Sequence, residues 1–469
     1  MRHFFAAQAF ALSLAVTPAA LADEPTETLT LPTFGKVALY TPVGAPEEVV
    51  LFVSGDGGWN LGVVSMAERV RDLGALVVGI DIRAFLNSLE ASKSCAYPAG
   101  ALEELSRAVQ IHRKLPAYKR PLLVGYSSGA TLVYAALAAA PPETFAGAIS
   151  LGFCPDLEIQ NAPCRQRGLA FEKKVKVAGY DLSPFPGLTV PWMVLQGEVD
   201  QVCDPGATRA FVAATGSSRL FSLPKVGHGF SVPRNWEPHF VEAYRAIASA
   251  TAPEEPAPSS ITGVEDLGLV EVLASGGKDQ GAMAVILTGD GGWADIDKSV
   301  AAGLAAAGVP VVGWSSLRYY WTPRTPEAAA GDLARIVEHY SAAWKKQRVL
   351  LVGYSFGADV MPFLVNRLPT SALARINSVS LLGLSDTAAF EFHVSSWLGG
   401  GGDAHRPTAP EVARLSVPVT CVHGTDEKDS ACLALNDQHV RIVRLGSGHH
   451  FGGNYERLVE LILDPTAAH

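Results

Sequence analysis

A serine in the pentapeptide Gly-Tyr-Ser-Phe-Gly, at positions 353–357, has the setting most typical of a catalytic nucleophile. An apolar run ends at this pentapeptide and a helix-compatible segment follows it, which is typical of a nucleophile elbow, the tight strand-to-helix turn that exposes a serine hydroxyl. A nearly identical sequence, Gly-Tyr-Ser-Ser-Gly, occurs at 125–129. We therefore predict Ser355 as the nucleophile and regard Ser127 as the centre of a second possible site.

A serine hydroxyl reacts only when a base takes its proton and an acid orients that base. In α/β-hydrolases the chain order is serine, then Asp or Glu, then histidine. The first half of the chain supplies Ser127, Asp200 and His228 in this order, which predicts a second possible triad.

The second half offers two adjacent histidines as the base for Ser355. The tetrapeptide Gly-His-Gly-Phe at 227–230 aligns with Gly-His-His-Phe at 448–451. This alignment selects His449 as the base and leaves His450 as the fallback.

The acid of the second half has two candidates, because alignment on Gly424 leaves Asp426 and Asp429 competing. In the first half the predicted acid lies three residues before Cys203, and in the second half Asp429 lies three residues before Cys432. We therefore predict Asp429 as the acid and keep Asp426 as the fallback.

Acyl transfer also needs backbone N–H groups that stabilise the oxyanion of the tetrahedral intermediate. One should come from Phe356, the residue after the nucleophile. The glycine-rich turn Gly-Asp-Gly-Gly-Trp at 289–293, which is duplicated at 55–59, should supply the other from Asp290 or Gly291.

The elements that must hold these residues also repeat. Each half shows the order of an apolar run, a glycine-rich turn, an amphipathic segment, a second strand, a long helical stretch and the elbow strand. Apolar strands alternating with helices predict a parallel sheet buried on both faces. We predict an α/β fold with two tandem α/β-hydrolase domains, each a doubly wound and mostly parallel sheet, at 23–250 and 263–469. A Pro-rich linker at 251–262 should join them.

Composition narrows the classes of function. Hydrophobic residues make up 48% of the 469 positions and charged residues 18%, which is typical of a globular protein. The net charge is −9 and no basic run is visible, so nucleic-acid binding is disfavoured. Residues 1–22 read as a secretory signal peptide, and no later apolar run predicts a transmembrane span.

The six cysteines fit an exported protein because their number is even in the chain and in each half. Cys421 with Cys432 is the only possible pair within the second half, whereas the four cysteines of the first half allow three connectivities. Their spacing matches no zinc pattern, so we predict disulfides and neither a metal nor another cofactor.

With these residues assembled, the sequence resembles the VirJ/AcvB family of bacterial virulence-associated serine hydrolases, in its longer two-domain form. The resemblance covers essentially the whole mature chain. Four segments carry it: Thr-Gly-Asp-Gly-Gly-Trp at 288–293, Tyr-Tyr-Trp-Thr-Pro-Arg-Thr-Pro-Glu at 319–327, Gly-Tyr-Ser-Phe-Gly-Ala-Asp at 353–359 and Gly-His-His-Phe-Gly-Gly at 448–453.

The resemblance implies a periplasmic enzyme that hydrolyses aminoacyl-phosphatidylglycerol, typically the lysyl form, at the outer leaflet of the inner membrane. It also implies that the activity belongs to Ser355. Because the substrate carries an ammonium group, acidic side chains should line the pocket, and the candidates are Asp290, Asp295, Asp297 and Asp359. Two alternatives stay open: a non-enzymatic accessory protein of virulence secretion, and a general periplasmic carboxylesterase with both domains active.

Overall fold

The computed structural model describes residues 25–91, 95–140, 144–164, 168–175, 177–250, 263–293, 295–390, 406–435 and 440–464. The predicted signal peptide and the predicted linker lie outside these ranges. Within them, no helix combines the length and the apolar character needed to cross a membrane.

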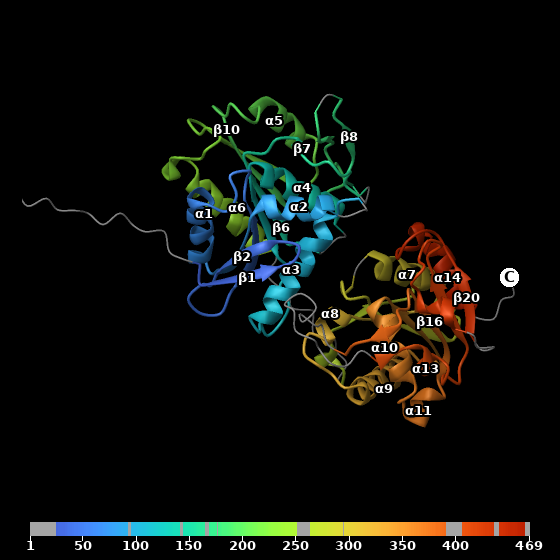
Figure 1. The fold of residues 1–469 in the computed structure, drawn as a ribbon. Coiled ribbons are helices and arrows are strands. Elements are labelled where there is room, and N and C mark those ends of the chain that lie inside the picture. Colours follow the sequence, from blue (N-terminus) through green and yellow to red (C-terminus); the bar gives the residue numbers. More distant parts are fainter. Residues whose placement is uncertain are drawn as a thin grey trace, which may run out of the picture.

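The first half is built on an eight-stranded sheet (Figure 1). In spatial order its strands are β1 (Glu27–Leu31), β2 (Gly35–Tyr40), β4 (Ala75–Ile80), β3 (Glu48–Val53), β5 (Leu122–Tyr126), β6 (Gly147–Leu151), β10 (Trp192–Gly197) and β11 (Ser218–Leu223). β2 is antiparallel to both of its neighbours, and the strands from β4 to β11 are parallel. Every residue of β4 is buried, as a strand covered on both faces requires.

The second half repeats this order in a seven-stranded sheet, in which the described residues show no counterpart of β1. Its strands are β12 (Leu269–Val272), β14 (Val311–Trp314), β13 (Ala282–Leu287), β15 (Arg348–Tyr354), β16 (Ile376–Leu382), β19 (Val419–His423) and β20 (Val440–Arg444). Only β12 is antiparallel to its neighbour. The predicted α/β fold with two tandem, mostly parallel sheets is therefore confirmed.

Helices cover both faces of each sheet, and the hydrophobic core of each half is divided between the two faces. In the first half, α1 (Leu61–Asp72) and α6 (Glu237–Ala250) cover one face. The other face is covered by α2 (Ile82–Ala91), α3 (Pro98–His112), α4 (Ser128–Ala139) and α5 (Pro205–Ala213).

The same layering recurs in the second half, where α7 (Asp295–Ala306) and α14 (Tyr455–Leu463) cover one face. The opposite face is covered by α8 (Ser316–Tyr319), α9 (Pro326–Ala343), α10 (Phe356–Val365), α11 (Thr370–Leu373) and α13 (Ala409–Val412). Outside the main sheets, a small sheet contains β7 (Asp156–Leu157), β9 (Tyr180–Leu182) and β8 (Phe171–Lys173), and β17 (Thr387–Ala388) pairs with β18 (Arg406–Pro407).

Each central strand ends in a sharp turn that begins a helix, and the serine of the motif occupies the turn. The backbone φ angle is 57° at Ser127 and 52° at Ser355, a region that residues with a side chain adopt only under strain. The glycine two positions later allows the helix to approach the neighbouring strand. A Cβ on Gly357 would lie 2.1 Å from the carbonyl oxygen of Leu287. The predicted elbow is therefore the conformation that this close approach imposes.

Three disulfides lie within the described residues. They join Cys95 to Cys164, Cys154 to Cys203 and Cys421 to Cys432. The bond of the second half is the predicted one, and the structure selects one of the three connectivities that the sequence left open for the first half. Such bonds persist in oxidising compartments.

We expect Gly357→Ala to lower the free energy of unfolding by about 3 kcal/mol or more, because its methyl group overlaps a carbonyl that belongs to the sheet. Gly331→Ala is the matched control. Gly331 lies exposed in α9 with open space around it, so this change should raise the free energy of unfolding by about 1 kcal/mol through helix propensity. Urea unfolding followed by circular dichroism measures both, and equal midpoints for the two variants would contradict the account.

Candidate active sites

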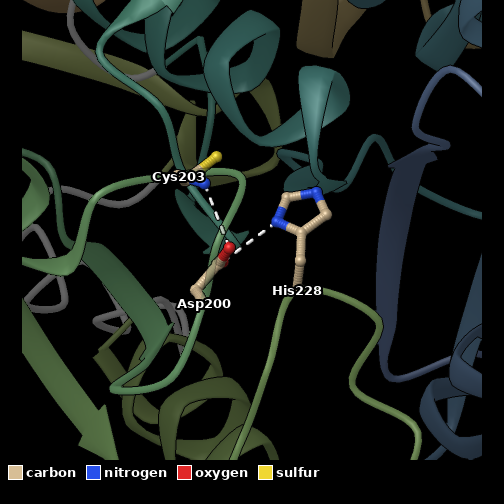
Figure 2. Close-up of side chains that lie close together, drawn as sticks. All are labelled: Asp200, Cys203 and His228. Atoms are coloured by element: carbon tan, nitrogen blue, oxygen red, sulfur yellow. Dashed lines mark hydrogen bonds and ion pairs between the residues drawn. The ribbon is translucent and has the colours of Figure 1, made fainter.

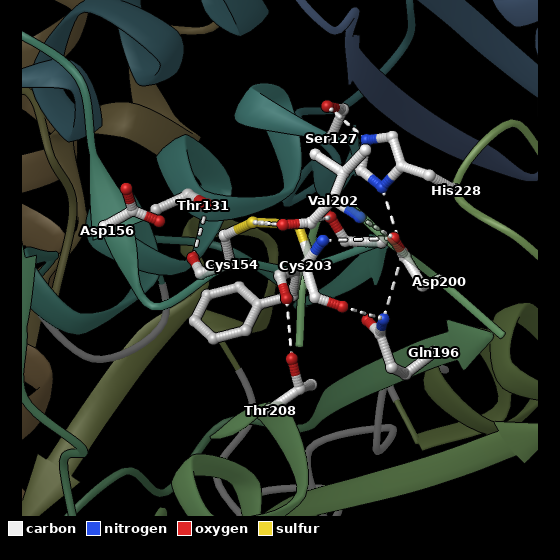
Figure 3. The surroundings of a disulfide bond; sticks show 12 residues. Ser127, Thr131, Cys154, Asp156, Gln196, Asp200, Val202, Cys203, Thr208 and His228 are labelled. Atoms are coloured by element: carbon white, nitrogen blue, oxygen red, sulfur yellow. Dashed lines mark hydrogen bonds and ion pairs between the residues drawn. A yellow bond between two sulfur atoms is a disulfide. The ribbon is translucent and has the colours of Figure 1, made fainter. Parts of the chain in front are cut away.

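The three predicted triad residues of the first half meet at the carboxyl ends of its parallel strands (Figure 3). Ser127 Oγ lies 2.8 Å from His228 Nε2, and His228 Nδ1 lies 2.9 Å from Asp200 Oδ2. These residues follow β5, β11 and β10, whose ends share one edge of the sheet. The arrangement allows His228 to take the proton of the serine hydroxyl while the carboxylate stabilises the imidazolium.

The carboxylate of Asp200 is held by several donors and has no exposed side-chain surface. Its Oδ1 accepts hydrogen bonds from the backbone N–H groups of Val202 (2.8 Å) and Cys203 (3.0 Å), and Gln196 Nε2 donates to Oδ2 (3.0 Å). Burial by itself raises the pKa of this carboxyl, but the hydrogen bonds from His228, Val202 and Cys203 outweigh burial and hold the pKa below its usual value. Asp200 is therefore ionised at neutral pH.

Asp200, Cys203 and His228 lie close enough together to suggest a metal site (Figure 2). The sulfur of Cys203 is bonded to Cys154, so it is not the thiolate that a metal would require. Both ring nitrogens of His228 are engaged, one by Asp200 and one by Ser127. Asp200 and His228 therefore fit a catalytic triad, and Cys203 fits a residue that supports it. The three side chains do not fit a metal centre.

Ser355 and His449 occupy the corresponding positions in the second half. Ser355 follows β15, and the ring of His449 lies against Gly383, where an added Cβ would be 2.5 Å from His449 Cε1. In the first half the ring of His228 lies in the same way against Gly152. The structure therefore places the predicted base of the second half at the position that the base of the first half occupies.

His449 is oriented by a glutamate. Its Nδ1 lies 2.7 Å from Glu427 Oε1, and Glu427 Oε2 accepts a hydrogen bond from the backbone N–H of Gly424 at 2.7 Å. No hydrogen bond joins Ser355 to His449 among the described residues, whereas Ser127 and His228 are bonded. Contacts of this kind are often loose without substrate and tighten in the complex. The fallback base, His450, is exposed, and its Nδ1 lies 3.5 Å from the hydroxyl of Tyr354.

In the structure Glu427, and not the predicted Asp429, contacts the imidazole of His449. Asp429 is exposed and lines the same cleft as His449, but the contact with the imidazole is made by Glu427. The fallback, Asp426, instead accepts a hydrogen bond from the backbone N–H of Gly448.

The alignment on cysteines failed because the two cysteines are not equivalent. Cys203 is bonded to Cys154, which follows β6, whereas Cys432 is bonded to Cys421, which lies within β19. Exact spacing from the preceding glycine, with glutamate admitted beside aspartate, selects Glu427 instead. Asp200 lies three residues after Gly197, and a glutamate lies three residues after Gly424.

The glycine-rich turn of the second half lies beside the nucleophile. The N–H of Gly292 donates to the carbonyl of Gly289 at 3.1 Å, and a Cβ on Gly289 would lie 3.4 Å from Ser355 Cβ. The turn that contains Asp290 and Gly291 therefore begins beside Ser355, where an oxyanion role would place it. That role, and the role of the Phe356 N–H group, stay predictions.

A cation from the first half reaches this turn. Arg107 of α3 donates to Asp290 Oδ2 at 2.7 Å and also pairs with Glu103. Nearby, Trp321 Nε1 donates to the carbonyl of Leu115 at 2.8 Å, so α3 and its following loop contact the region of α8 (Figure 1). The first half therefore contacts the glycine-rich turn beside Ser355 through Arg107.

The acidic residues that we predicted to bind an ammonium group differ in availability. Asp290 pairs with Arg107, and Asp297 is buried. Asp359 is also buried, and its Oδ1 accepts a hydrogen bond from the backbone N–H of Ser385 at 2.7 Å. The side chain of Asp295 lies outside the described part of the chain. Among the three aspartates whose side chains are described, one is paired with an arginine and two are buried.

Open carboxylates instead lie beside His449, in a cleft of about 530 Å³. Asp426, Glu427 and Asp429 line this cleft together with one cation, Lys428. Glu427 is committed to His449, which leaves the two exposed aspartates facing solvent. The sequence presents these aspartates as candidates for the triad, and only the structure shows that they form a charged surface beside His449.

The strand order of each sheet, the serine at each elbow, and an acid and a histidine after the last two strands of each sheet define an α/β-hydrolase fold in each half. The chain belongs to the family of bacterial virulence proteins called VirJ, whose model matches residues 47–150 and 281–469, more than half of the chain. This confirms the resemblance found in the sequence. The first matched segment contains Ser127 but neither Asp200 nor His228, whereas the second contains the whole candidate site of Ser355.

Several solved structures are similar to parts of this chain. An esterase domain from a Rhodothermus marinus protein is 16% identical and covers 47% of this chain and 97% of its own, with a TM-score of 0.33. An α/β serine hydrolase without a lid from Xanthomonas campestris is 22% identical and covers 49% of this chain and 97% of its own, with a TM-score of 0.34. No curated protein matches the chain.

Asp359 should make stability depend on pH. Burial raises its pKa to about 7 from a usual value of 3.8, so the folded chain keeps a proton that the unfolded chain releases. The free energy of unfolding should therefore fall as the pH rises from about 4 to about 7. Asp359→Asn should remove the contribution of this carboxyl to the pH dependence of the free energy of unfolding. It should also stabilise the protein at pH 7.

Thermal unfolding across this pH range measures the effect. Asp386→Asn is the matched control, because Asp386 is exposed nearby and its loss should leave the pH dependence unchanged. A parallel pH dependence in Asp359→Asn and the native chain would show that Asp359 does not titrate in this range.

Proposed function

We propose that the second half is a serine hydrolase of aminoacyl esters, with Ser355 as nucleophile, His449 as base and Glu427 as the acid that orients the base. The observation that carries the proposal is the 2.7 Å contact between His449 Nδ1 and Glu427 Oε1, beside a serine held at a strained elbow. The proposed substrate is aminoacyl-phosphatidylglycerol, which the family resemblance implies, and the products are phosphatidylglycerol and a free amino acid.

The reaction proceeds through an acyl-enzyme. Ser355 Oγ attacks the ester carbonyl and gives its proton to His449 Nε2, while Glu427 stabilises the imidazolium through Nδ1. The backbone N–H groups of Phe356 and of the turn at 290–291 stabilise the oxyanion. His449 then protonates the departing glycerol oxygen, and a water molecule activated by the same imidazole releases the amino acid and restores Ser355.

The charge of the cleft supports a cationic acyl group. An aminoacyl ester carries an ammonium next to its carbonyl, and Asp426 and Asp429 are exposed carboxylates in the cleft that also contains His449. Opposite charges that lie within one cleft attract each other even when solvent partly screens them. The cleft therefore favours an aminoacyl ester over a neutral ester of the same size.

The proposed location is the periplasm, where the substrate is exposed at the outer leaflet of the inner membrane. Three disulfides fit an oxidising compartment, and the signal-like residues 1–22 supply a route of export. The net charge of −9 gives no long-range attraction to anionic lipid, so docking on the bilayer depends on local contacts.

Ser355→Ala should abolish release of lysine from vesicles that contain lysyl-phosphatidylglycerol. Glu427→Gln should lower kcat on the order of 10³- to 10⁴-fold, because the amide no longer stabilises the imidazolium or selects its tautomer. Asp429→Asn is the matched control. It removes a carboxylate two residues away that does not contact His449, so kcat should stay within about twofold while KM rises for the cationic substrate.

Equal losses of kcat in Glu427→Gln and Asp429→Asn would contradict the assignment of the acid. Full lysine release by Ser355→Ala would contradict the assignment of the nucleophile. Circular dichroism of each variant separates these outcomes from misfolding.

A further inference from the structure

The first half holds a serine, a histidine and an aspartate that the proposed aminoacyl hydrolase does not use. We propose that this half is a second, independent esterase, centred on Ser127, that accepts esters of short uncharged acyl groups. The proposal does not depend on the assignment of Ser355, because it rests on the geometry of the first half alone.

The geometry of Ser127, His228 and Asp200 is already that of a working proton relay. Ser127 Oγ and His228 Nε2 are 2.8 Å apart, and the side chain of His228 is only 17% exposed, compared with 40% for His449. Asp200 has no exposed side-chain surface, whereas Glu427 is 20% exposed. The relay of the first half is therefore the better shielded from water, and shielding strengthens its electrostatic interactions.

A structural role does not account for Asp200. Burial of an ionised carboxylate costs free energy unless it is fully hydrogen-bonded, and a fold needs no such group behind a histidine that faces a serine. The chain nevertheless places three donors around Asp200 besides His228, namely the N–H groups of Val202 and Cys203 and the side chain of Gln196. These donors keep the carboxylate charged and in position to stabilise a protonated His228.

A cavity of about 410 Å³ opens onto this relay. Ser127 and His228 contribute to its wall, and the turn at 55–58, which duplicates the proposed oxyanion turn, lies beside the serine. Val63 and Met66 of α1 supply buried apolar surface, and Val202 lies at an exposed edge. The volume accommodates a short acyl group together with the alcohol part of its ester, and the lining is partly apolar.

The charge of this cavity differs from that of the cleft beside His449. Asp56 is the only carboxylate among its lining residues, no Lys or Arg lines it, and Asp56 is exposed. The cleft of the second half contains three carboxylates and one lysine, Lys428, so carboxylates outnumber cations there. A neutral acyl group therefore suits the first site and an ammonium-bearing acyl group suits the second, so the duplicated units differ in substrate class.

The proposed reaction needs no partner other than the ester and water. Ser127 Oγ forms a bond to the acyl carbon while its proton moves to His228 Nε2, and the alcohol leaves with that proton as the ester C–O bond breaks. Water then attacks the acyl-serine, His228 accepts its proton, and the carboxylic acid departs as the proton returns to Ser127 Oγ.

The test uses the full chain and two probes that are nearly isosteric, ethyl isobutyrate and the ethyl ester of alanine, in which an ammonium replaces a methyl group. Ser355→Ala removes the second site. This variant should hydrolyse the isobutyrate ester with kcat/KM about tenfold or more above that for the alanine ester. Adding Ser127→Ala should reduce the rate to that of the buffer.

A fluorophosphonate probe provides a readout that does not depend on the substrate. In Ser355→Ala, peptide mapping should find the phosphonyl group on Ser127, and His228→Gln should prevent its attachment while circular dichroism shows a folded chain. Ser65→Ala, a serine-to-alanine change on the exposed side of α1, is the matched control and should leave labelling and hydrolysis unchanged.

Hydrolysis that persists in the double variant, or a folded Ser355→Ala chain that is not labelled at Ser127, would overturn the proposal. A preference of Ser355→Ala for the alanine ester would overturn the assigned substrate class. If Ser355→Ala hydrolyses neither the lysyl lipid nor the isobutyrate ester, the proposed esterase at Ser127 is wrong and the proposed role of Ser355 stands. If Ser355→Ala hydrolyses both substrates, the proposed role of Ser355 is wrong and a reactive Ser127 is supported.

Discussion

The close approach of a helix to a neighbouring strand at each elbow is the constraint on which both candidate sites depend. A Cβ on Gly129 would lie 2.4 Å from the carbonyl oxygen of Val53, and one on Gly357 would lie 2.1 Å from that of Leu287. Because the helix begins this close to the sheet, the residue between strand and helix has no relaxed conformation available. The serine therefore sits above the sheet edge, where the loops that carry the acid and the histidine also end.

The two units share this elbow and differ in what they place behind the histidine. Asp200 lies three residues after Gly197 at the end of β10, and Glu427 lies three residues after Gly424, which follows β19. The two carboxylates thus have equivalent positions but different side chains. The aspartate is enclosed by backbone and amide donors, and the glutamate lies in a half-open cleft. The same backbone thus places a buried carboxylate behind the histidine in one unit and a partly exposed one in the other.

Much of this was predictable because the determining patterns are local. Strand runs, glycine-rich turns and elbows are read over a few residues, so the fold and the serine at each elbow followed from the sequence. The pairing of Cys421 with Cys432 also followed, because the second half offers no other partner. The contact of Glu427 with His449 did not follow, because the alignment assumed that cysteines with equal spacing have equal roles. The contact of Arg107 with Asp290 was not predictable, since no local pattern encodes which surfaces of two units meet.

The bond between Cys154 and Cys203 has a consequence for when the first unit matures. Cys203 donates its N–H to Asp200, so the cross-link fastens the turn that holds the buried carboxylate. A newly made chain in a reducing environment lacks this cross-link, and its Asp200 turn is then held by hydrogen bonds without a covalent tie. Oxidation would then act as a maturation step that couples assembly of this site to the compartment in which the chain resides.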